Sequence, residues 1–341
     1  MLGLDDVRAA RAVVDRYLPR APLEHSPLLS QELGRVIHLK LETFKPTRTF
    51  KVRGALNKLA SLDASSRSRG VVAASAGSHA LGVSYAAAVL GIPATVVMPE
   101  GVSETIVGVC RAYGADVLLR GDVYDDTVVL AREIERGEGR TFVHPYADPL
   151  IVAGQCTIGL EVLEELPPVD TVVVAVGGGG LIGGVALAMK SASPRPPRVI
   201  GVEPEGADAV RRSVAAGKPV LLDAPHSVAD KLVARTTDQL NVDLAARYVD
   251  DIVTVSDRAM EDATYDFLER LSLLVEPSGA APLAAVRSGA VPAGGKTVLV
   301  VSGGNADPAL IERIVREHGR APEYPASRAA PSRSRVGRPG R

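Results

Sequence analysis

A lysine that directly follows a phenylalanine is the first residue with chemical potential. Lys51 follows Phe50 in the segment from Lys40 to Gly54, close to a turn expected at Pro46. A lysine amine forms Schiff bases with carbonyl compounds when burial or a neighbouring charge lowers its pKa. Most lysines are solvated surface charges, so Lys51 gains meaning only from the segments that accompany it.

Four consecutive glycines, Gly177 to Gly180, form the strongest of these segments. They follow an apolar run and precede a helical stretch that begins near Leu181. Glycines let the backbone approach an anion closely, and a helix N-terminus adds positive potential, so we expect a phosphate cradle here. The spaced glycines of a dinucleotide fingerprint and the Gly-Lys-Ser/Thr of a Walker loop are both missing.

Two shorter segments also end apolar runs. The first joins a strand to a helix through the small residues and histidine Ser75, Ala76, Gly77, Ser78 and His79. Its backbone N–H groups suit a carboxylate or a phosphate, although a tight turn explains the segment equally well. The second, Val298 to Asn305, places Ser302 at the carboxyl end of a strand, where open α/β sheets bind ligands. An ordinary strand-ending turn is the alternative there.

The elements that must position these segments alternate along the chain. Apolar runs without polar alternation predict strands buried on both faces, hence parallel sheets covered by helices. Alanine-rich or amphipathic stretches separate these runs, which predicts an α/β fold. We predict strands at residues 71–74, 94–98, 116–119, 141–144, 171–176, 198–203, 251–255 and 297–301.

The composition is that of a globular protein without a nucleic-acid or membrane partner. Hydrophobic residues make up 46% of the 341 residues, and 39 basic residues balance 40 acidic ones. Residues 172–189 carry no charge, but their glycines predict a strand, a loop and a helix rather than a membrane span. Cys110 and Cys156 are too few for a disulfide framework, and the N-terminus lacks the apolar run of a signal peptide. We expect a cytoplasmic protein.

The four segments together resemble one enzyme family. A Pro-Thr-x-x-Phe-Lys-x-Arg-Gly stretch, a Ser-Ala-Gly-x-His loop, the tetraglycine and a Ser-Gly-Gly-Asn strand end occur in that order. This arrangement is similar to the fold-type II (tryptophan synthase β-like) pyridoxal-phosphate enzymes, and within them to the threonine/serine dehydratase and serine racemase group. Further similar stretches extend the resemblance over roughly residues 20 to 318, namely His144–Leu150, Gly201–Gly206 and Val275–Ala280.

The resemblance implies an α/β fold with two domains and an active site in the cleft between them. Each domain is expected to hold a mostly parallel, open twisted sheet with helices on both faces. We assign residues 1–47 and 147–320 to a large cofactor-binding domain and residues 48–146 to a small mobile domain. Residues 321–341, rich in Pro, Ser, Gly and Arg, predict a disordered basic tail. A homodimer and the cofactor pyridoxal 5'-phosphate are also implied.

The resemblance further implies a role for each motif. Lys51 is expected to hold the cofactor aldehyde as a Schiff base and to remove the α-proton of a small amino-acid substrate. The substrate carboxylate is expected to lie against Ser75, Ala76, Gly77, Ser78 and His79. The expected cofactor contacts are Phe50, Lys51, Ser78, Gly177, Gly178, Gly179, Gly180, Leu181 and Ser302.

Two residues favour elimination over other reactions of this family. Ser302, opposite the ring nitrogen, provides no permanent negative charge, which disfavours a long-lived carbanion. Ala76 stands where serine racemases have a serine, so we expect racemisation to be secondary. The leading hypothesis is a dehydratase (ammonia-lyase) that converts a β-hydroxy-amino acid such as L-threonine or L-serine to a 2-oxo acid and ammonia. The alternatives are a racemase or β-replacement enzyme of the same fold, and a non-catalytic pyridoxal-phosphate-binding protein.

Other positions depart from the family pattern. Ser78 replaces an asparagine that normally contacts the ring hydroxyl. Arg48 replaces a glycine, and we hypothesise that it contacts an acidic substrate side chain, with a solvent-facing arginine as the alternative. The family's cation loop has Glu203 but shows Ala209 in place of its second acid. We therefore assign no metal.

Overall fold

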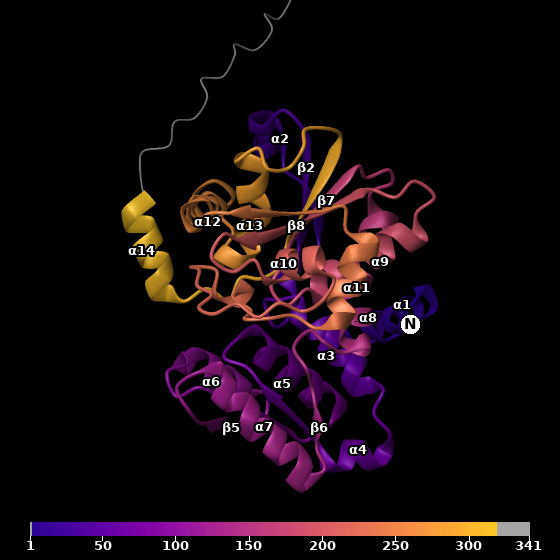
Figure 1. Cartoon of the computed structure of the whole chain (residues 1–341), viewed down its shortest axis with the longest axis vertical. Coiled ribbons are helices and arrows are strands. Elements are labelled where there is room, and N and C mark those ends of the chain that lie inside the picture. The colour runs from indigo at the N-terminus through magenta and orange to yellow at the C-terminus, as the bar shows by residue number, and fades with distance from the viewer. Residues whose placement is uncertain (1, 319–341) are drawn as a thin grey trace, which may run out of the picture.

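The computed structural model describes residues 2–318 and contains two β-sheets, one above the other in Figure 1. The larger sheet has six strands in the order β1-β2-β10-β7-β8-β9, and the smaller has four in the order β5-β4-β3-β6. β1 pairs antiparallel with β2, and the other pairs are parallel. The strands are β1 (Leu23–His25), β2 (Val36–Leu41), β3 (Val71–Ala74), β4 (Ala94–Met98), β5 (Asp116–Leu119), β6 (Thr141–Phe142), β7 (Thr171–Ala175), β8 (Arg198–Pro204), β9 (Asp251–Val255) and β10 (Lys296–Val301).

Helices surround both sheets and also fill the space between them. The smaller sheet is accompanied by α4 (Ala64–Arg69), α5 (Ser78–Leu90), α6 (Glu104–Ala112) and α7 (Tyr124–Glu138). Three helices pack together between the sheets: α1 (Leu4–Tyr17), α3 (Lys51–Ala60) and α8 (Pro149–Glu165). The larger sheet is accompanied by α2 (Pro27–Leu33), α9 (Gly180–Ala192), α10 (Ala209–Ala216), α11 (Gln239–Tyr248), α12 (Asp257–Leu271), α13 (Pro277–Arg287) and α14 (Pro308–His318), and two short 3₁₀ turns are η1 (Glu42–Phe44) and η2 (Asp230–Leu232).

Apolar side chains of each sheet alternate between two buried faces. In β7, Val172 and Val174 join a core with α9 residues, whereas Val173 joins a core with α12 and α13 residues. In β3, Val71 packs with α5 residues and Val72 with Ala131 of α7. Because both faces are covered, polar alternation is lost, as expected for parallel strands. The predicted α/β fold with two mostly parallel sheets is confirmed.

The strand predictions missed the first two strands of the larger sheet. β2 carries His38 and Lys40 between apolar residues, which hides it from a search for apolar runs. Lys40 is nevertheless fully buried, with its Nζ 2.7 Å from Glu161. At the other predicted positions a strand is present, although β6 ends at Phe142, two residues earlier than expected. No helix within residues 2–318 is long and apolar enough to span a membrane.

The division into residues 1–47 with 147–320 and residues 48–146 remains a prediction. The four strands of the smaller sheet, β3 to β6, are consecutive in the chain, and the strands before and after them form the larger sheet. The tail predicted at residues 321–341 lies outside the described residues.

A buried charge network supports the helix that begins with Lys51. Arg53, fully buried in the first turn of α3, donates to both carboxylate oxygens of Glu42 at 2.8 and 2.9 Å. It also donates to both oxygens of Glu161 on α8 at 2.7 and 2.9 Å. Burial alone raises the pKa of Glu161, but the hydrogen bonds and charge of Arg53, with the charge of Lys40, hold it below its ordinary value. Bidentate pairing of this kind fixes orientation as well as charge.

Helices α3 and α8 cross at two glycines. A Cβ atom added to Gly154 would lie 2.5 Å from the Cα atom of Gly54 and 2.7 Å from the carbonyl oxygen of Arg53. The two backbones are therefore in direct contact, and the start of α3 rests on α8 without intervening side chains.

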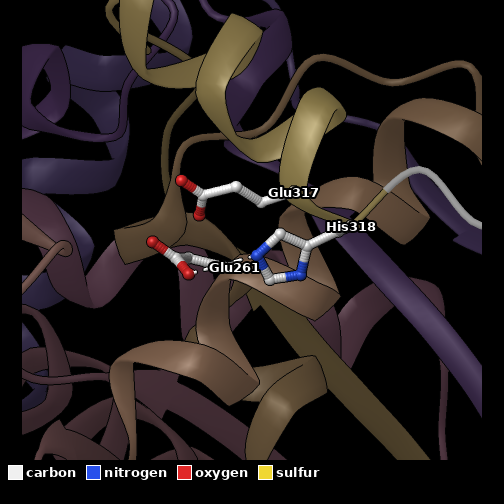
Figure 2. A group of neighbouring side chains, drawn as sticks. All are labelled: Glu261, Glu317 and His318. Atoms are coloured by element: carbon white, nitrogen blue, oxygen red, sulfur yellow. Dashed lines mark hydrogen bonds and ion pairs between the residues drawn. The ribbon is translucent and has the colours of Figure 1, made fainter.

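The last described helix, α14, is attached to α12 by charged side chains (Figure 2). The ring nitrogens of His318 lie 3.2 Å from Glu261 and 2.6 Å from Asp262. Arg313 donates to Glu261 at 2.7 Å and to Glu317 at 3.0 Å. Glu261, Glu317 and His318 are residue types that bind metals, and their ligand atoms lie within 4.8 Å of one another. Because Arg313 already pairs with both glutamates, we interpret the cluster as an ion-pair network that holds α14.

Candidate active site

The carboxyl ends of three parallel strands bring the sequence motifs to one cleft. β7 leads into the tetraglycine, β10 leads into Ser302, and β3 leads into Ser75. An inner cavity in this cleft is lined by every residue predicted to contact a cofactor: Phe50, Lys51, Ser78, Gly177, Gly178, Gly179, Gly180, Leu181 and Ser302. The structure thus places side by side segments that lie far apart in the sequence.

An outer cavity of about 980 Å³ adjoins the inner one. Its walls contain all the residues predicted to contact a substrate carboxylate: Ser75, Ala76, Gly77, Ser78 and His79. The two cavities share the lining residues Lys51, Ser78, Pro145, Tyr146, Gly178 and Lys231. The shared residues make a continuous path from an enclosed inner site to a wider, solvent-accessible cleft.

Lys51 lies at the junction of the two cavities. It is the first residue of α3, and its Nζ donates to the carbonyl oxygen of Pro145 at 2.8 Å. Burial lowers the pKa of this amine to about 8. The amine lies 5.3 Å from the ring centre of Phe50, whose own N–H donates to the carbonyl oxygen of Ser302. A neutral amine, the form needed for nucleophilic or base chemistry, is therefore accessible near neutral pH.

The tetraglycine forms a cradle that only glycine fits. A Cβ atom on Gly178 would lie 2.4 Å from the ring of Tyr146, and one on Gly180 would lie 2.8 Å from the Tyr146 carbonyl oxygen. The carbonyl oxygen of Gly178 accepts hydrogen bonds from Thr237 at 2.9 Å and Asn241 at 2.8 Å. Since α9 begins at Gly180, the first N–H groups of that helix lack intrahelical partners and can bind an anion.

We predict that Gly178→Ala weakens the binding of a phosphate-bearing cofactor by at least about fivefold, the lower end of what overpacking costs. The added methyl group collides with Tyr146, so the loop must move away from the position that holds the anion. Titration of cofactor-free protein, followed by cofactor absorbance, measures the change. Gly108→Ala is the matched control, because a Cβ atom there meets nothing within 4 Å. Wild-type affinity in Gly178→Ala contradicts this role of the loop.

The loop between β3 and α5 is shaped by its own side chains. The hydroxyl of Ser75 accepts hydrogen bonds from the N–H groups of Gly77 at 3.1 Å and Ala80 at 3.2 Å. His79 is buried, and its Nε2 lies 2.9 Å from the carbonyl oxygen of Val143. Burial, followed by the charge of Lys51, lowers the pKa of His79 to about 3. A neutral histidine bonded in this way holds the loop in place and is not available as a proton acceptor from a substrate.

Ser78 and Ser302 contribute differently to the inner cavity. Asn305 donates to the hydroxyl of Ser78 at 3.3 Å and to the carbonyl oxygen of Thr47 at 3.0 Å. The hydroxyl of Ser78 is thereby held by the segment that follows β10 and also carries Ser302. Ser302 is buried and lines the inner cavity as a neutral hydroxyl.

Several lining residues were not recognised in the sequence. Tyr146 packs against the glycine loop, and Lys231 and Glu276 line the inner cavity beside Ser302. Tyr146 and Glu276 lie in the stretches His144–Leu150 and Val275–Ala280, so their motif membership was a usable signal. Lys231 lies in a segment without any motif, and only the fold brings it to the cleft.

Comparisons with known proteins agree with this geometry. Residues 14–303 match the family model described as pyridoxal-phosphate dependent enzyme. The L-threonine ammonia-lyase of Thermotoga maritima is 41% identical over 317 residues, 93% of this chain and 79% of that protein. The chain belongs to the pyridoxal-phosphate-dependent enzyme family.

Solved structures of this family superpose closely on the chain. The T.th. threonine deaminase has a TM-score of 0.84 and 40% identity, covering 89% of this chain and 99% of that one. Maize serine racemase has a TM-score of 0.87 and 34% identity, covering 93% of this chain and 97% of that one. The similarity to the threonine/serine dehydratase and serine racemase group is confirmed, and the cofactor is pyridoxal phosphate.

The residues present suit this cofactor. A phosphate fits the glycine cradle, where a Cβ atom on Gly178 or Gly180 would collide with Tyr146, and an aldehyde fits the amine of Lys51 with its lowered pKa. The hydroxyl of Ser302 can pair with a ring nitrogen without adding charge. Pyridoxal phosphate thus finds a partner for each of its reactive groups among the inner-cavity residues.

Arg48, which departs from the family pattern, and Glu203, which matches the family's cation loop, both lie away from the cavities. Arg48 is exposed, with a positive φ of 56°, and lines neither cavity, so the structure gives no support to contact with an acidic substrate. Glu203 is buried, and its two carboxylate oxygens accept from the N–H groups of Val210 and Arg211, each at 2.9 Å. Burial raises the pKa of Glu203 to about 8. It therefore caps the N-terminus of α10.

We predict that cofactor capture depends on pH if Lys51 is the attachment residue. Below pH 8 most of the Lys51 amine is protonated, so the rate of covalent attachment should rise about tenfold per pH unit and level off above pH 8. Stopped-flow absorbance after mixing cofactor-free protein with pyridoxal phosphate measures this rate. Free Nα-acetyl-lysine is the control, since its rate keeps rising towards the ordinary lysine pKa of about 10.4. A protein rate that follows the free-lysine curve contradicts the burial of this amine.

Proposed function

We propose that this chain is a pyridoxal-phosphate-dependent dehydratase (ammonia-lyase) whose substrate is L-threonine, with L-serine as a smaller alternative. The observation that carries the proposal is the 41% identity to an L-threonine ammonia-lyase over 93% of this chain. Loss of water from L-threonine, followed by hydrolysis, yields 2-oxobutanoate and ammonia. The outer cavity leaves ample room for a small amino acid beside Lys51.

The chain's own residues position the reactants and remove the α-proton in this reaction. When bound, pyridoxal phosphate withdraws electrons from the α-carbon of the amino acid. Lys51 removes the α-proton, because its amine is buried and its pKa is lowered to about 8. The N–H groups of Gly177–Leu181 hold the phosphate, and the Ser75–His79 loop orients the carboxylate. Ser302 leaves the ring nitrogen without a fixed counter-charge.

Ala76 favours elimination over racemisation. Racemisation needs a second group that returns a proton to the opposite face of the α-carbon, and a methyl side chain has no such proton. Ala76 lines the outer cavity that Lys51 also lines, but unlike Lys51 it has no group that exchanges protons. The racemase alternative draws its support from the similarity to maize serine racemase, at 34% identity, which shares the fold.

Incubation of the purified protein with β-hydroxy-amino acids tests the proposal. Ammonia and 2-oxobutanoate should form in equal amounts from L-threonine, with no accumulation of D-allothreonine, the product of inversion at the α-carbon, on a chiral column. L-Serine and L-threo-3-hydroxyaspartate complete the panel and report substrate choice. If D-serine forms from L-serine faster than pyruvate does, the chain is a racemase, and if the panel releases no ammonia the lyase assignment is wrong.

A cytoplasmic location and a homodimer also belong to this proposal. Cys110 and Cys156 are both free and buried, as suits a reducing compartment. The homodimer rests on the family resemblance, and light scattering during size-exclusion chromatography distinguishes it from a monomer of 35.6 kDa.

A further inference from the structure

A second lysine, Lys231, occupies the cleft and has no part in the scheme above. It lies in η2 and lines both the inner and the outer cavity. Its side chain is 24% exposed, and its Nζ lies 3.1 Å from Glu276 and 2.9 Å from Asp230. The ammonium group is therefore fixed at the boundary between the cofactor site and the substrate cleft.

Glu276 favours the charged form of this lysine. The carboxylate of Glu276 is buried at the start of α13, and burial raises its pKa, so a nearby positive charge stabilises its ionised form. Burial also opposes the charge on Lys231, but the carboxylates of Glu276 and then Asp230 outweigh it and raise the pKa of Lys231. The ion pair therefore holds a charged ammonium in the cleft instead of letting it fold out into solvent.

The direction of the Lys231 side chain shows what it can bind. Its backbone oxygen lies beside the phosphate loop, 3.0 Å from a Cβ atom built on Gly177. Its Cε atom lies beside the other loop, 3.7 Å from a Cβ atom built on Gly77. The side chain thus extends away from the phosphate cradle and towards the Ser75–His79 loop.

One hydrogen of the ammonium remains for a ligand. An ammonium group has three donors; at most two of them serve the carboxylate oxygens of Asp230, at 2.9 and 3.1 Å, and Glu276 lies 3.1 Å away as an ion-pair partner. An anion held by the N–H groups of the Ser75–His79 loop would lie against Gly77, within reach of this third donor. The substrate group of that charge is the α-carboxylate, because L-threonine has no second anion.

We propose that Lys231 is a substrate-binding residue whose ammonium group, together with the Ser75–His79 loop, holds the α-carboxylate of the amino acid. The proposal rests on the function proposed above, since it takes an amino acid as the ligand. Lys231 adds a positive charge to the neutral N–H groups of the loop. A hydrogen bond from a charged donor to a carboxylate is stronger than one from a neutral donor.

Lys231→Met tests this role through binding as well as turnover. The probes are L-2-aminobutyrate, which has no β-hydroxyl group to lose, and its amide, which lacks the carboxylate charge. Their Kd values are measured on the holoenzyme by the absorbance change of the bound cofactor. We expect Lys231→Met to weaken L-2-aminobutyrate about 10- to 100-fold and the amide less than about threefold, the difference being one charge-assisted hydrogen bond. Lys231→Arg should recover most of the affinity for the acid.

Controls separate this role from a structural one. Lys218→Met removes an exposed lysine that lines neither cavity and should leave both Kd values unchanged. Lys231→Gln keeps a hydrogen-bond donor beside Glu276 but removes the charge. The same measurements are made on this variant if Lys231→Met fails to fold. An acid-to-amide ratio equal to that of the wild type overturns the proposal, as does loss of cofactor affinity with an unchanged ratio. Turnover of L-threonine by the wild type is scored separately, so failure of the proposed function is recognised independently.

Discussion

Replacement of Lys51 by alanine is expected to abolish ammonia release from L-threonine, with a loss of at least about 1000-fold in kcat. The variant loses both the attachment point for the cofactor and the base at the α-carbon. Its carbonyl partner, Pro145, belongs to the backbone and provides no substitute base. His79 provides none either, since burial lowers its pKa to about 3.

The Lys51→Ala experiment includes two readouts and a matched control. Coupled assay of 2-oxobutanoate gives turnover, and the cofactor absorbance band that depends on the covalent link reports attachment. Lys218→Ala, at an exposed position outside both cavities, should behave as the wild type in both. Added methylamine should restore part of the activity by standing in for the missing amine. Turnover within tenfold of the wild type would remove Lys51 from the centre of the mechanism.

Replacement of Arg53 by methionine is expected to lower the free energy of unfolding by about 3–5 kcal/mol. The change leaves the buried carboxylates of Glu42 and Glu161 without their bidentate partner in the core. Lys40 still pairs with one oxygen of Glu161, whereas Glu42 keeps, among residues 2–318, only the charge of the nearby buried Lys45, with which no ion pair forms. Because α3 begins with Lys51, we also expect a lower kcat in whatever fraction remains folded.

Urea titration followed by far-ultraviolet circular dichroism measures the stability change. Arg8→Met is the control, since Arg8 pairs with Asp5 on the surface and exposed pairs contribute little. Arg53→Met combined with Glu42→Gln should recover part of the loss by removing one unpaired charge. A midpoint for Arg53→Met equal to that of Arg8→Met would show that the network does not stabilise the fold.

The sequence predicts the fold of this chain well wherever the strands are continuously apolar. β3, β4, β7 and β10 are buried on both faces, and their apolar runs stand out for that reason. β2 escaped prediction because Lys40 is buried in it through an ion pair, an interaction that depends on a residue of α8 far along the chain.

Site residues with an unusual local sequence could be predicted, whereas those placed by contacts between distant segments could not. The tetraglycine is visible in sequence because its composition is unusual, and the structure explains it by contact with Tyr146. Lys231 could not have been selected among the lysines, since its place in the cleft is set by an ion pair with Glu276. Arg48 is the opposite case: it departs conspicuously from the family pattern in sequence, but it lies on the surface, outside the cleft.

The central claim is that Lys51, and no other lysine, carries the cofactor. Borohydride reduction of the holoenzyme makes the lysine–cofactor link permanent, and mass spectrometry of the digested protein then locates it. We expect a single phosphopyridoxyl group on the peptide that contains Lys51. Labelling of Lys231, the other lysine that lines the inner cavity, or of no lysine at all would contradict the account.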